Sequence, residues 1–171
     1  MTADRPGCTE TLRDGSRVTI CPLRPDDAAL YPDFLANVTA DDLRLRLFAP
    51  IAEVTPAMID RLTHYDPNTA IALIALDEAG RMLGVARLHD DPDGNGGEFA
   101  VLVRSALKGH GLGWLLMQHI IARARRKGLG TVHGEVLSEN LTMLQMCKEL
   151  GFGIADEPDE AGVKRVTLKL L

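Results

Sequence analysis

Hydrophobic and polar residues alternate along several short segments of this chain, and other short segments are almost continuously apolar. Both patterns are typical of β-strands, the first half-buried and the second fully buried. Most of these runs end near Gly, Pro, Asp or Asn, the residues that favour turns. The pattern therefore predicts seven strands, at residues 17–22, 69–77, 82–89, 98–103, 131–137, 152–155 and 163–170.

Between these strands, apolar residues recur at the 3.6-residue spacing of helices. The clearest case is 111–127, where one face is apolar, basic residues fill the last turns and Gly128 follows as a stop. Thr55 and Pro56 have the residue types of an N-cap and a first helical position. The predicted helices are 27–37, 40–47, 55–64, 111–127 and 141–150.

The order of these elements indicates a mixed α/β or α+β domain and not a doubly wound sheet. Residues 1–15 show little apolar periodicity, so we expect a mobile leader there and a single domain over 16–171. A length of 171 residues suits one domain. The segment 98–103 has period two, which places Glu98, Ala100 and Leu102 on one face of its strand.

Composition narrows the function classes. The net charge of −5 argues against a general nucleic-acid binder, and we expect no nucleic-acid partner. No apolar run reaches a membrane span of about 20 residues, and the N-terminus lacks the apolar core of a secretory signal. Cys8, Cys21 and Cys147 lie far apart, without metal-ligand spacing. We therefore expect reduced thiols, no metal site and a cytoplasmic protein without membrane attachment.

The chemistry-bearing stretch follows the strand at 98–103. It holds a glycine-dense loop, Lys108-Gly-His-Gly-Leu-Gly113, and then the long helix. Glycine lets a ligand approach the backbone, and the unpaired first amides of a helix favour an anion such as a phosphate. Lys108 would add positive charge. Trp114 stands where a dinucleotide fingerprint has glycine, and no Gly-Lys-Ser/Thr ending of a P-loop follows. By itself the loop is equally compatible with a plain strand–helix connection.

The Lys108–Gly113 run resembles the Arg/Gln-x-x-Gly-x-Gly/Ala loop of the GNAT family of N-acetyltransferases. Downstream, residues 139–152 resemble that family's later helix, which contains an Asn and ends in Gly-Phe, here Gly151-Phe152. The distance between the two motifs and the order of elements also match. The resemblance covers nearly the whole chain apart from the leader. It implies a GNAT-like fold, a central, mostly antiparallel seven-stranded sheet with flanking helices.

The resemblance further implies an acyltransferase that uses acetyl-CoA as acyl donor and needs no metal. In the family, loop amides hold the CoA pyrophosphate and the preceding strand offers main-chain groups to the pantetheine arm and the thioester carbonyl. Carried over to this chain, the cofactor-binding residues are Val101, Leu102, Val103, Lys108, Gly109, His110, Gly111, Leu112, Gly113 and Asn140. Lys108 replaces the usual Arg or Gln, so its charge remains but bidentate geometry is lost.

Glu98 is the candidate general base. An amine needs one because its ammonium form is not nucleophilic at neutral pH. The apolar neighbours of Glu98 would raise its pKa, and the Glu-Phe-Ala-Val segment looks like that of bacterial protein lysine acetyltransferases, whose glutamate there acts as base. The alternative is a solvated glutamate that closes a hairpin. Cys147 stands where many family members have a proton-donating Tyr, and we expect a packed residue there in preference to an acylated nucleophile.

The acceptor of the acetyl group is the part of the expected reaction about which the sequence says least. Residues 22–27 and 43–48 look like the N-terminal half of bacterial protein acetyltransferases that modify acyl-CoA synthetases, which points to a protein lysine as acceptor and to such a synthetase as partner. Arg44 and Arg46 either face the acceptor or lie on a solvated helix face, and we favour the solvated face. The alternatives are a small-molecule amine acetyltransferase and a non-catalytic acyl-CoA sensor.

Overall fold

The computed structural model describes residues 5–47 and 54–171. Within that part of the chain, eight strands form one sheet in the order β1-β2-β3-β4-β5-β6-β8-β7. All neighbouring strands are antiparallel except β5 and β6. The strands are β1 (Cys8–Thr11), β2 (Arg17–Pro22), β3 (Ala70–Leu76), β4 (Met82–Asp90), β5 (Gly96–Val103), β6 (Thr131–Leu137), β7 (Gly153–Asp156) and β8 (Val163–Lys169).

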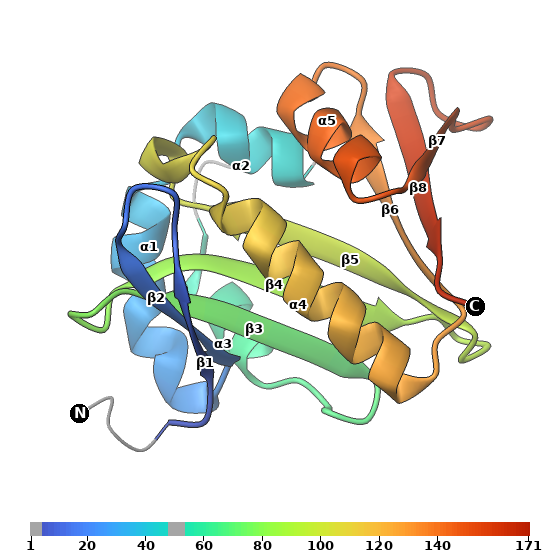
Figure 1. The fold of residues 1–171 in the computed structure, drawn as a ribbon. Helices are drawn as coiled ribbons and strands as arrows, with labels where there is room; N and C mark the ends of the chain where they lie inside the picture. The colour runs from blue at the N-terminus through green and yellow to red at the C-terminus, as the bar shows by residue number, and fades with distance from the viewer. Residues whose placement is uncertain (1–4, 48–53) are drawn as a thin grey trace.

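Helices cover both faces of this sheet (Figure 1). Helix α4 crosses one face, and its side chains at Leu116, Met117 and Ile120 are fully buried against the strands. Three short helices, α1 to α3, lie on the opposite face, while α5 packs beside β7 at the far end of the sheet. The helices are α1 (Tyr31–Ala36), α2 (Ala40–Leu47), α3 (Pro56–Thr63), α4 (Leu112–Lys127) and α5 (Leu141–Glu149).

The expected mixed α/β class with a mostly antiparallel sheet is confirmed, and each predicted strand is present within one or two residues at either end. Thr55 caps α3 as expected, because its side chain accepts a hydrogen bond from the Met58 amide. The predicted helix 27–37 is instead a 3₁₀ segment, Pro25–Leu30, followed by α1. Pro32 lies in the first turn of α1, and its missing N–H prevents a continuous helix through this point.

The expected leader needs a correction. Residues 8–11 form β1, which pairs with β2 and adds an eighth strand to the seven that were predicted. Leu12 directly after β1 is buried, and Arg5 reaches the carboxylate of Asp27. Residues 1–4 lie outside the described part. A four-residue strand has too little apolar pattern to be predicted, because its partner strand and not its own sequence stabilises it.

Strands β5 and β6, the parallel pair among the described strands, are hydrogen-bonded over only a short length, and the sheet splits beyond it. Strands β5 and β6 pair only through Gly96–Glu98 and Thr131–His133. Beyond Glu98 they diverge, so the edge of β5 over residues 99–103 has no strand partner within the described residues. The Phe99 ring lies across this split against β6: a Cβ on Gly134 would lie 2.7 Å from its Cε1 atom. Glycine at 134 thus lets an aromatic ring sit where the strands part.

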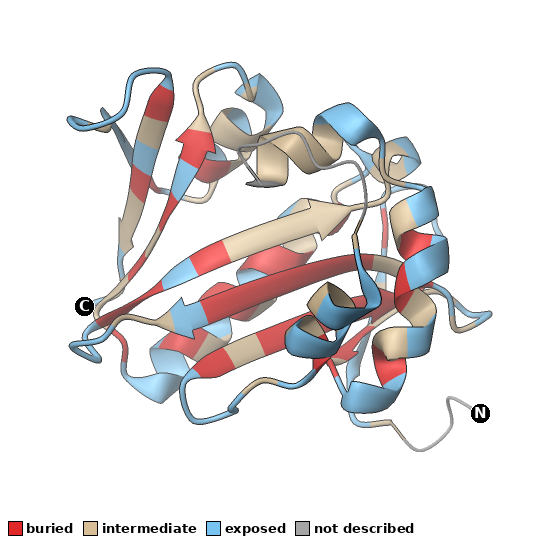
Figure 2. Ribbon diagram, turned by 180° about the vertical axis from the view of Figure 1, so that it is seen from behind, coloured by how far each residue is buried: buried red, intermediate tan, exposed pale blue. Residues whose placement is uncertain are grey.

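The two faces of the sheet form two apolar cores. Phe99, Val101 and Val103 pack with the α4 residues, whereas Leu102 packs on the other face with Tyr31 and Phe34 among others. The expected two-faced pattern of β5 is therefore confirmed. Figure 2 shows β3 and β4 buried along most of their length, at the centre of the sheet. No helix in the described ranges is long and apolar enough to cross a lipid bilayer.

Candidate active site

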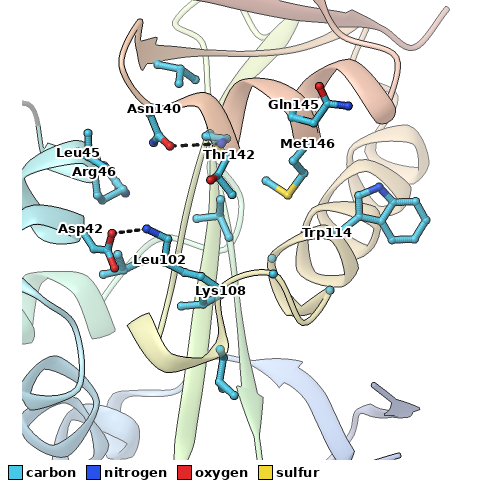
Figure 3. A pocket seen from close by; sticks show the side chains of 18 of the residues that line it. Asp42, Leu45, Arg46, Leu102, Lys108, Trp114, Asn140, Thr142, Gln145 and Met146 are labelled. Atoms are coloured by element: carbon cyan, nitrogen blue, oxygen red, sulfur yellow. Dashed lines mark hydrogen bonds and ion pairs between the residues drawn. The ribbon is translucent and has the colours of Figure 1, made fainter. Parts of the chain in front are cut away.

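A cavity opens where β5 and β6 diverge, and we call it the donor cavity. Its volume is about 560 Å³. It is bounded by β5, the glycine loop with the start of α4, α5, and the side chains of α2 (Figure 3). Its floor is the partnerless edge of β5 at residues 99–103. A groove of this form suits a long ligand that makes main-chain contacts along β5.

The glycine loop presents backbone amides at one end of this cavity. Gly109 and Gly111 have φ of 83° and 90°, the left-handed region that favours glycine. The amides of the loop and of the first turn of α4 lack a protein acceptor among the described residues, namely those of Gly109, Gly111, Leu112, Gly113 and Trp114. Together with the positive end of the α4 dipole, these N–H groups form an anion site.

Most residues expected to bind the cofactor meet in this cavity. Its lining contains Val101, Leu102, Val103, Lys108, Gly109, Gly111, Gly113 and Asn140. Two expected residues do not line it with their side chains: His110 is exposed to solvent, and Leu112 is fully buried in the core. The Leu112 amide remains available to a ligand, whereas the His110 amide donates to the Leu107 carbonyl at 3.2 Å.

The charge of Lys108 is not free as the sequence suggested. Its Nζ lies 2.5 Å from Oδ1 of Asp42 on α2, and Ser105 Oγ donates to the other carboxylate oxygen (Figure 3). Burial acts to raise the pKa of Asp42, but the hydrogen bonds from Lys108 and Ser105 outweigh it and hold that pKa below its ordinary value. Asp42 is therefore ionised, and the ion pair links α2 to the glycine loop.

Arg13 is a residue of this site that the sequence did not reveal. It lies in the turn between β1 and β2 and lines the donor cavity beside the glycine loop. A Cβ on Gly111 would lie 3.6 Å from its Nε. Within the described ranges it makes no side-chain hydrogen bond or ion pair, so its guanidinium is available to a ligand. No local signal could identify it, because the segment itself shows no motif.

Two residues of the second motif have different roles. Asn140 is the N-cap of α5, where its Oδ1 accepts from the Met143 amide at 3.2 Å, and it lines the donor cavity (Figure 3). Cys147 is fully buried in the core, outside that lining. Burial raises the pKa of its thiol to about 12. A thiol in this environment does not act as a nucleophile at neutral pH.

Glu98 lies at the start of the split, outside the cavity lining and exposed to solvent. It is paired across the sheet with His89 of β4, so the two side chains share one face. That face also carries Ala100 and Leu102, as the sequence pattern predicted. Glu98 thus lies near the start of β5, just before the residues that form the floor of the donor cavity, and on the face of the sheet opposite α4.

A second cavity, of about 260 Å³, lies on that same face. Helices α1, α2 and α3 form its walls, and β4 and β5 form its floor. It shares Arg46, Ala100 and Leu102 with the donor cavity, so the two cavities adjoin across α2 and β5. Arg46 is half-buried between them, not on a solvated face as we expected. Its neighbour Arg44 does face outward and pairs with Glu139 at 2.8 Å.

Comparison with known proteins agrees with this geometry. The model of the acetyltransferase (GNAT) family matches residues 38–152, which include the glycine loop, the split strands and α5. The chain belongs to the GNAT family. GNAT members are acetyltransferases, and a solved structure with this fold holds acetyl-CoA as its cofactor. The chain is accordingly an N-acyltransferase that uses acetyl-CoA.

Two curated acetyltransferases and one solved structure are similar to this chain over most of its length. Acetyltransferase PA5475 of Pseudomonas aeruginosa is 31% identical over 155 residues, covering 89% of this chain and 83% of the relative. The L-methionine sulfoximine/L-methionine sulfone acetyltransferase of the same species is 32% identical, covering 82% and 80%. The GNAT domain of S. lividans PAT superposes with a TM-score of 0.88 at 28% identity, covering 96% and 97%.

Proposed function

We propose that this acetyltransferase moves the acetyl group directly from acetyl-CoA to a primary amine, with Glu98 as general base. The observation that carries the proposal is the position of Glu98. It stands at the head of the open β5 edge, on the face that carries the second cavity. An acceptor amine in that cavity approaches the end of the donor cavity from the side of the sheet opposite α4.

Different residues of the chain bind acetyl-CoA, polarise its thioester and accept the proton of the amine. The amides of Gly109 and of Gly111–Trp114 hold the CoA pyrophosphate, and main-chain groups of β5 hold the pantetheine arm and polarise the thioester carbonyl. The amine nitrogen bonds to the carbonyl carbon while the C–S bond breaks. Glu98 accepts the proton that the amine loses, directly or through one water. CoA leaves as a thiolate, which takes a proton from solvent, since Cys147 is buried away from the cavity.

Two acceptor classes follow from different observations. A protein lysine, for example on an acyl-CoA synthetase, is supported by the sequence resemblance and by the similarity to the PAT domain. A small-molecule amine is supported by the relative that acts on L-methionine sulfoximine and L-methionine sulfone. The second cavity favours the small amine, because helices wall it and its volume is that of a small ligand.

The test is release of CoA from acetyl-CoA in the presence of candidate acceptors. The panel contains acyl-CoA synthetases, lysine peptides and small amines, and mass spectrometry locates the new acetyl group. We expect CoA release that depends on an amine and that Glu98→Gln suppresses. Amine-dependent release that Glu98→Gln leaves unchanged would overturn the assigned base, and an acetylated Cys147 would overturn direct transfer.

A further inference from the structure

Positive side chains gather in the second cavity, and they belong to different elements. Arg46 comes from α2, Arg61 from α3 and Arg87 from β4; His89 of β4 lies beside them, but burial lowers its pKa and disfavours its charged form. The remaining lining is largely apolar or aromatic, with Leu35, Leu43, Met58, Leu62, Tyr31 and Tyr65 among its members. A small apolar cavity with several cations is a binding site for a small ligand that carries negative charge.

Arg87 is held rigidly in this cavity. Only 6% of its surface is exposed, and its Nη2 donates to the Tyr31 hydroxyl at 3.2 Å and to the Leu62 carbonyl at 2.5 Å. Its Nε and Nη1 donate to no acceptor within the described ranges. The N–H groups of Nε and Nη1 thus remain available for charge-assisted hydrogen bonds to an anionic ligand.

Arg46 lies beside Arg87 and has no hydrogen bond or ion pair with any residue of the described part. Burial lowers the pKa of Arg46, and the charge of Arg87 lowers it further. Glu98 is the carboxylate that opposes this effect. A half-buried guanidinium next to another one is electrostatically costly unless an anion joins them. The pair is therefore incompletely neutralised by the protein itself.

The strand register places Arg87 and the proposed base at diagonal positions on the same face of the sheet. Arg87 is opposite Ala100, and the next pair on the same face is His89 opposite Glu98. Diagonal neighbours in such a ladder lie roughly 7–8 Å apart. Ala100, the residue opposite Arg87, has a small side chain and lines the second cavity, so it leaves room there for a ligand. A ligand that joins an arginine of this cavity to Glu98 therefore carries an anionic group and an amine on one small molecule.

We propose that the acceptor is a small amine with a carboxylate close to it, an amino acid with an apolar side chain. Its carboxylate binds between Arg46 and Arg87, its side chain packs among the apolar residues of α1 and α3, and its amine faces Glu98 and the thioester. The inference rests on the proposed acetyl transfer and names the substrate class for it. Arg46 and Arg87 act here as specificity-determining residues and not as acids or bases.

Matched pairs of acceptors test the carboxylate. L-phenylalanine is compared with 2-phenylethylamine, and L-methionine with 3-(methylthio)propylamine, by kcat/KM for CoA release at saturating acetyl-CoA. A lysine peptide with blocked termini completes the panel. We expect the member with a carboxylate to be favoured by at least about tenfold, the size of a hydrogen bond to a charged group. Equal values within both pairs, or transfer to the lysine peptide alone, would overturn this inference and leave the proposed function standing.

Substitution of Arg46 tests whether this arginine binds the carboxylate of the acceptor. Arg46→Gln should raise KM for the amino acids by about tenfold or more, with kcat less affected and little change for the two amines without a carboxylate. Arg44→Gln is the matched control on the same helix, because Arg44 faces Asp41 and Glu139. A uniform loss for all acceptors in Arg46→Gln would contradict carboxylate recognition. Transfer to no member of the panel by a protein that binds acetyl-CoA would overturn both proposals.

Discussion

Lys108 Nζ lies 2.5 Å from Asp42 Oδ1, so the lysine at the lip of the glycine loop is already neutralised by a carboxylate of α2. Charge at the donor site therefore depends on other groups. The partnerless amides of the loop supply one part, and Arg13 of the β1–β2 turn is positioned to supply another. This arrangement differs from a loop in which the cation at the first motif position faces the phosphates alone.

Arg13→Gln should weaken acetyl-CoA binding by about threefold to fivefold at low salt, because an exposed charge pair contributes up to about 1 kcal/mol. The loss should shrink as ionic strength rises and screens the phosphates. Calorimetry of both proteins at low and high salt measures this. Arg17→Gln, in the same hairpin but outside the cavity lining, is the control. Equal affinities of Arg13→Gln and the unmodified protein at low salt would exclude Arg13 from the donor site.

Gly111→Val should lower acetyl-CoA affinity at least several-fold. The new side chain would stand where the pyrophosphate approaches the loop, and the residue would be forced into left-handed backbone at φ of 90°. Gly94→Val is a matched control, since Gly94 also has positive φ (73°) but lies in the remote β4–β5 turn with open space around it. Both variants should lose stability, whereas only Gly111→Val should lose affinity. Unchanged affinity in folded Gly111→Val would disprove the loop assignment.

Glu98→Gln should leave acetyl-CoA affinity nearly unchanged and lower kcat by about 10²–10⁴-fold, the usual worth of a general base. The deficit should narrow as pH rises toward the pKa of the acceptor amine, because solvent then provides free amine. Steady-state kinetics across pH with a small-amine acceptor measures this, with Glu78→Gln in the exposed β3–β4 turn as control. Full kcat at neutral pH would make Glu98 a hairpin residue only.

Arg5→Ala should destabilise the fold by about 3–5 kcal/mol, because it leaves the carboxylate of Asp27 buried without its partner. Arg5 Nη1 donates to Asp27 at 2.6 Å, and both side chains are at most 7% exposed. Urea unfolding of this variant beside exposed Arg17→Ala measures the difference. A change below 1 kcal/mol would show that residues before β1 do not hold the domain together.

The same pair predicts an acid dependence. Burial acts to raise the pKa of Asp27, but the hydrogen bonds from Arg5 and the Arg24 amide outweigh it and lower that pKa below its ordinary value. A lowered carboxyl pKa stabilises the fold above the unfolded-state value of about 3.9, and this contribution disappears as pH falls through the folded-state value. The stability gap between the unmodified protein and Arg5→Ala should therefore narrow below about pH 4.

Cys147→Ala should keep acetyl transfer within about twofold of the unmodified kcat, as expected for a thiol that takes no part in the chemistry. In the folded protein, iodoacetamide should label exposed Cys8 and not the buried Cys147, whose thiol pKa is raised to about 12. Peptide mass spectrometry before and after unfolding distinguishes the two. Labelling of Cys147 in the native protein, or loss of turnover in a stable Cys147→Ala, would reopen the ping-pong route.

Local features of the sequence determined most of the helices and strands and the glycine loop. Thr55 and Pro56 specify a helix start within one turn, and Gly109 and Gly111 permit left-handed backbone at the loop. The apolar spacing of α4 fixes which of its faces is buried. Such signals act over a few residues, so they are readable without knowledge of the rest of the chain.

The tertiary structure decided which side chains meet. Lys108 and Asp42 are 66 residues apart in sequence, and the pairing that neutralises Lys108 exists only because α2 packs against the loop. Arg46, which we expected on a solvated face, is half-buried because α2 lies beside both cavities. Strand β1 and Arg13 joined the sheet and the site through the β2 pairing. Contacts of this kind depend on the packing of distant elements, which no local preference encodes.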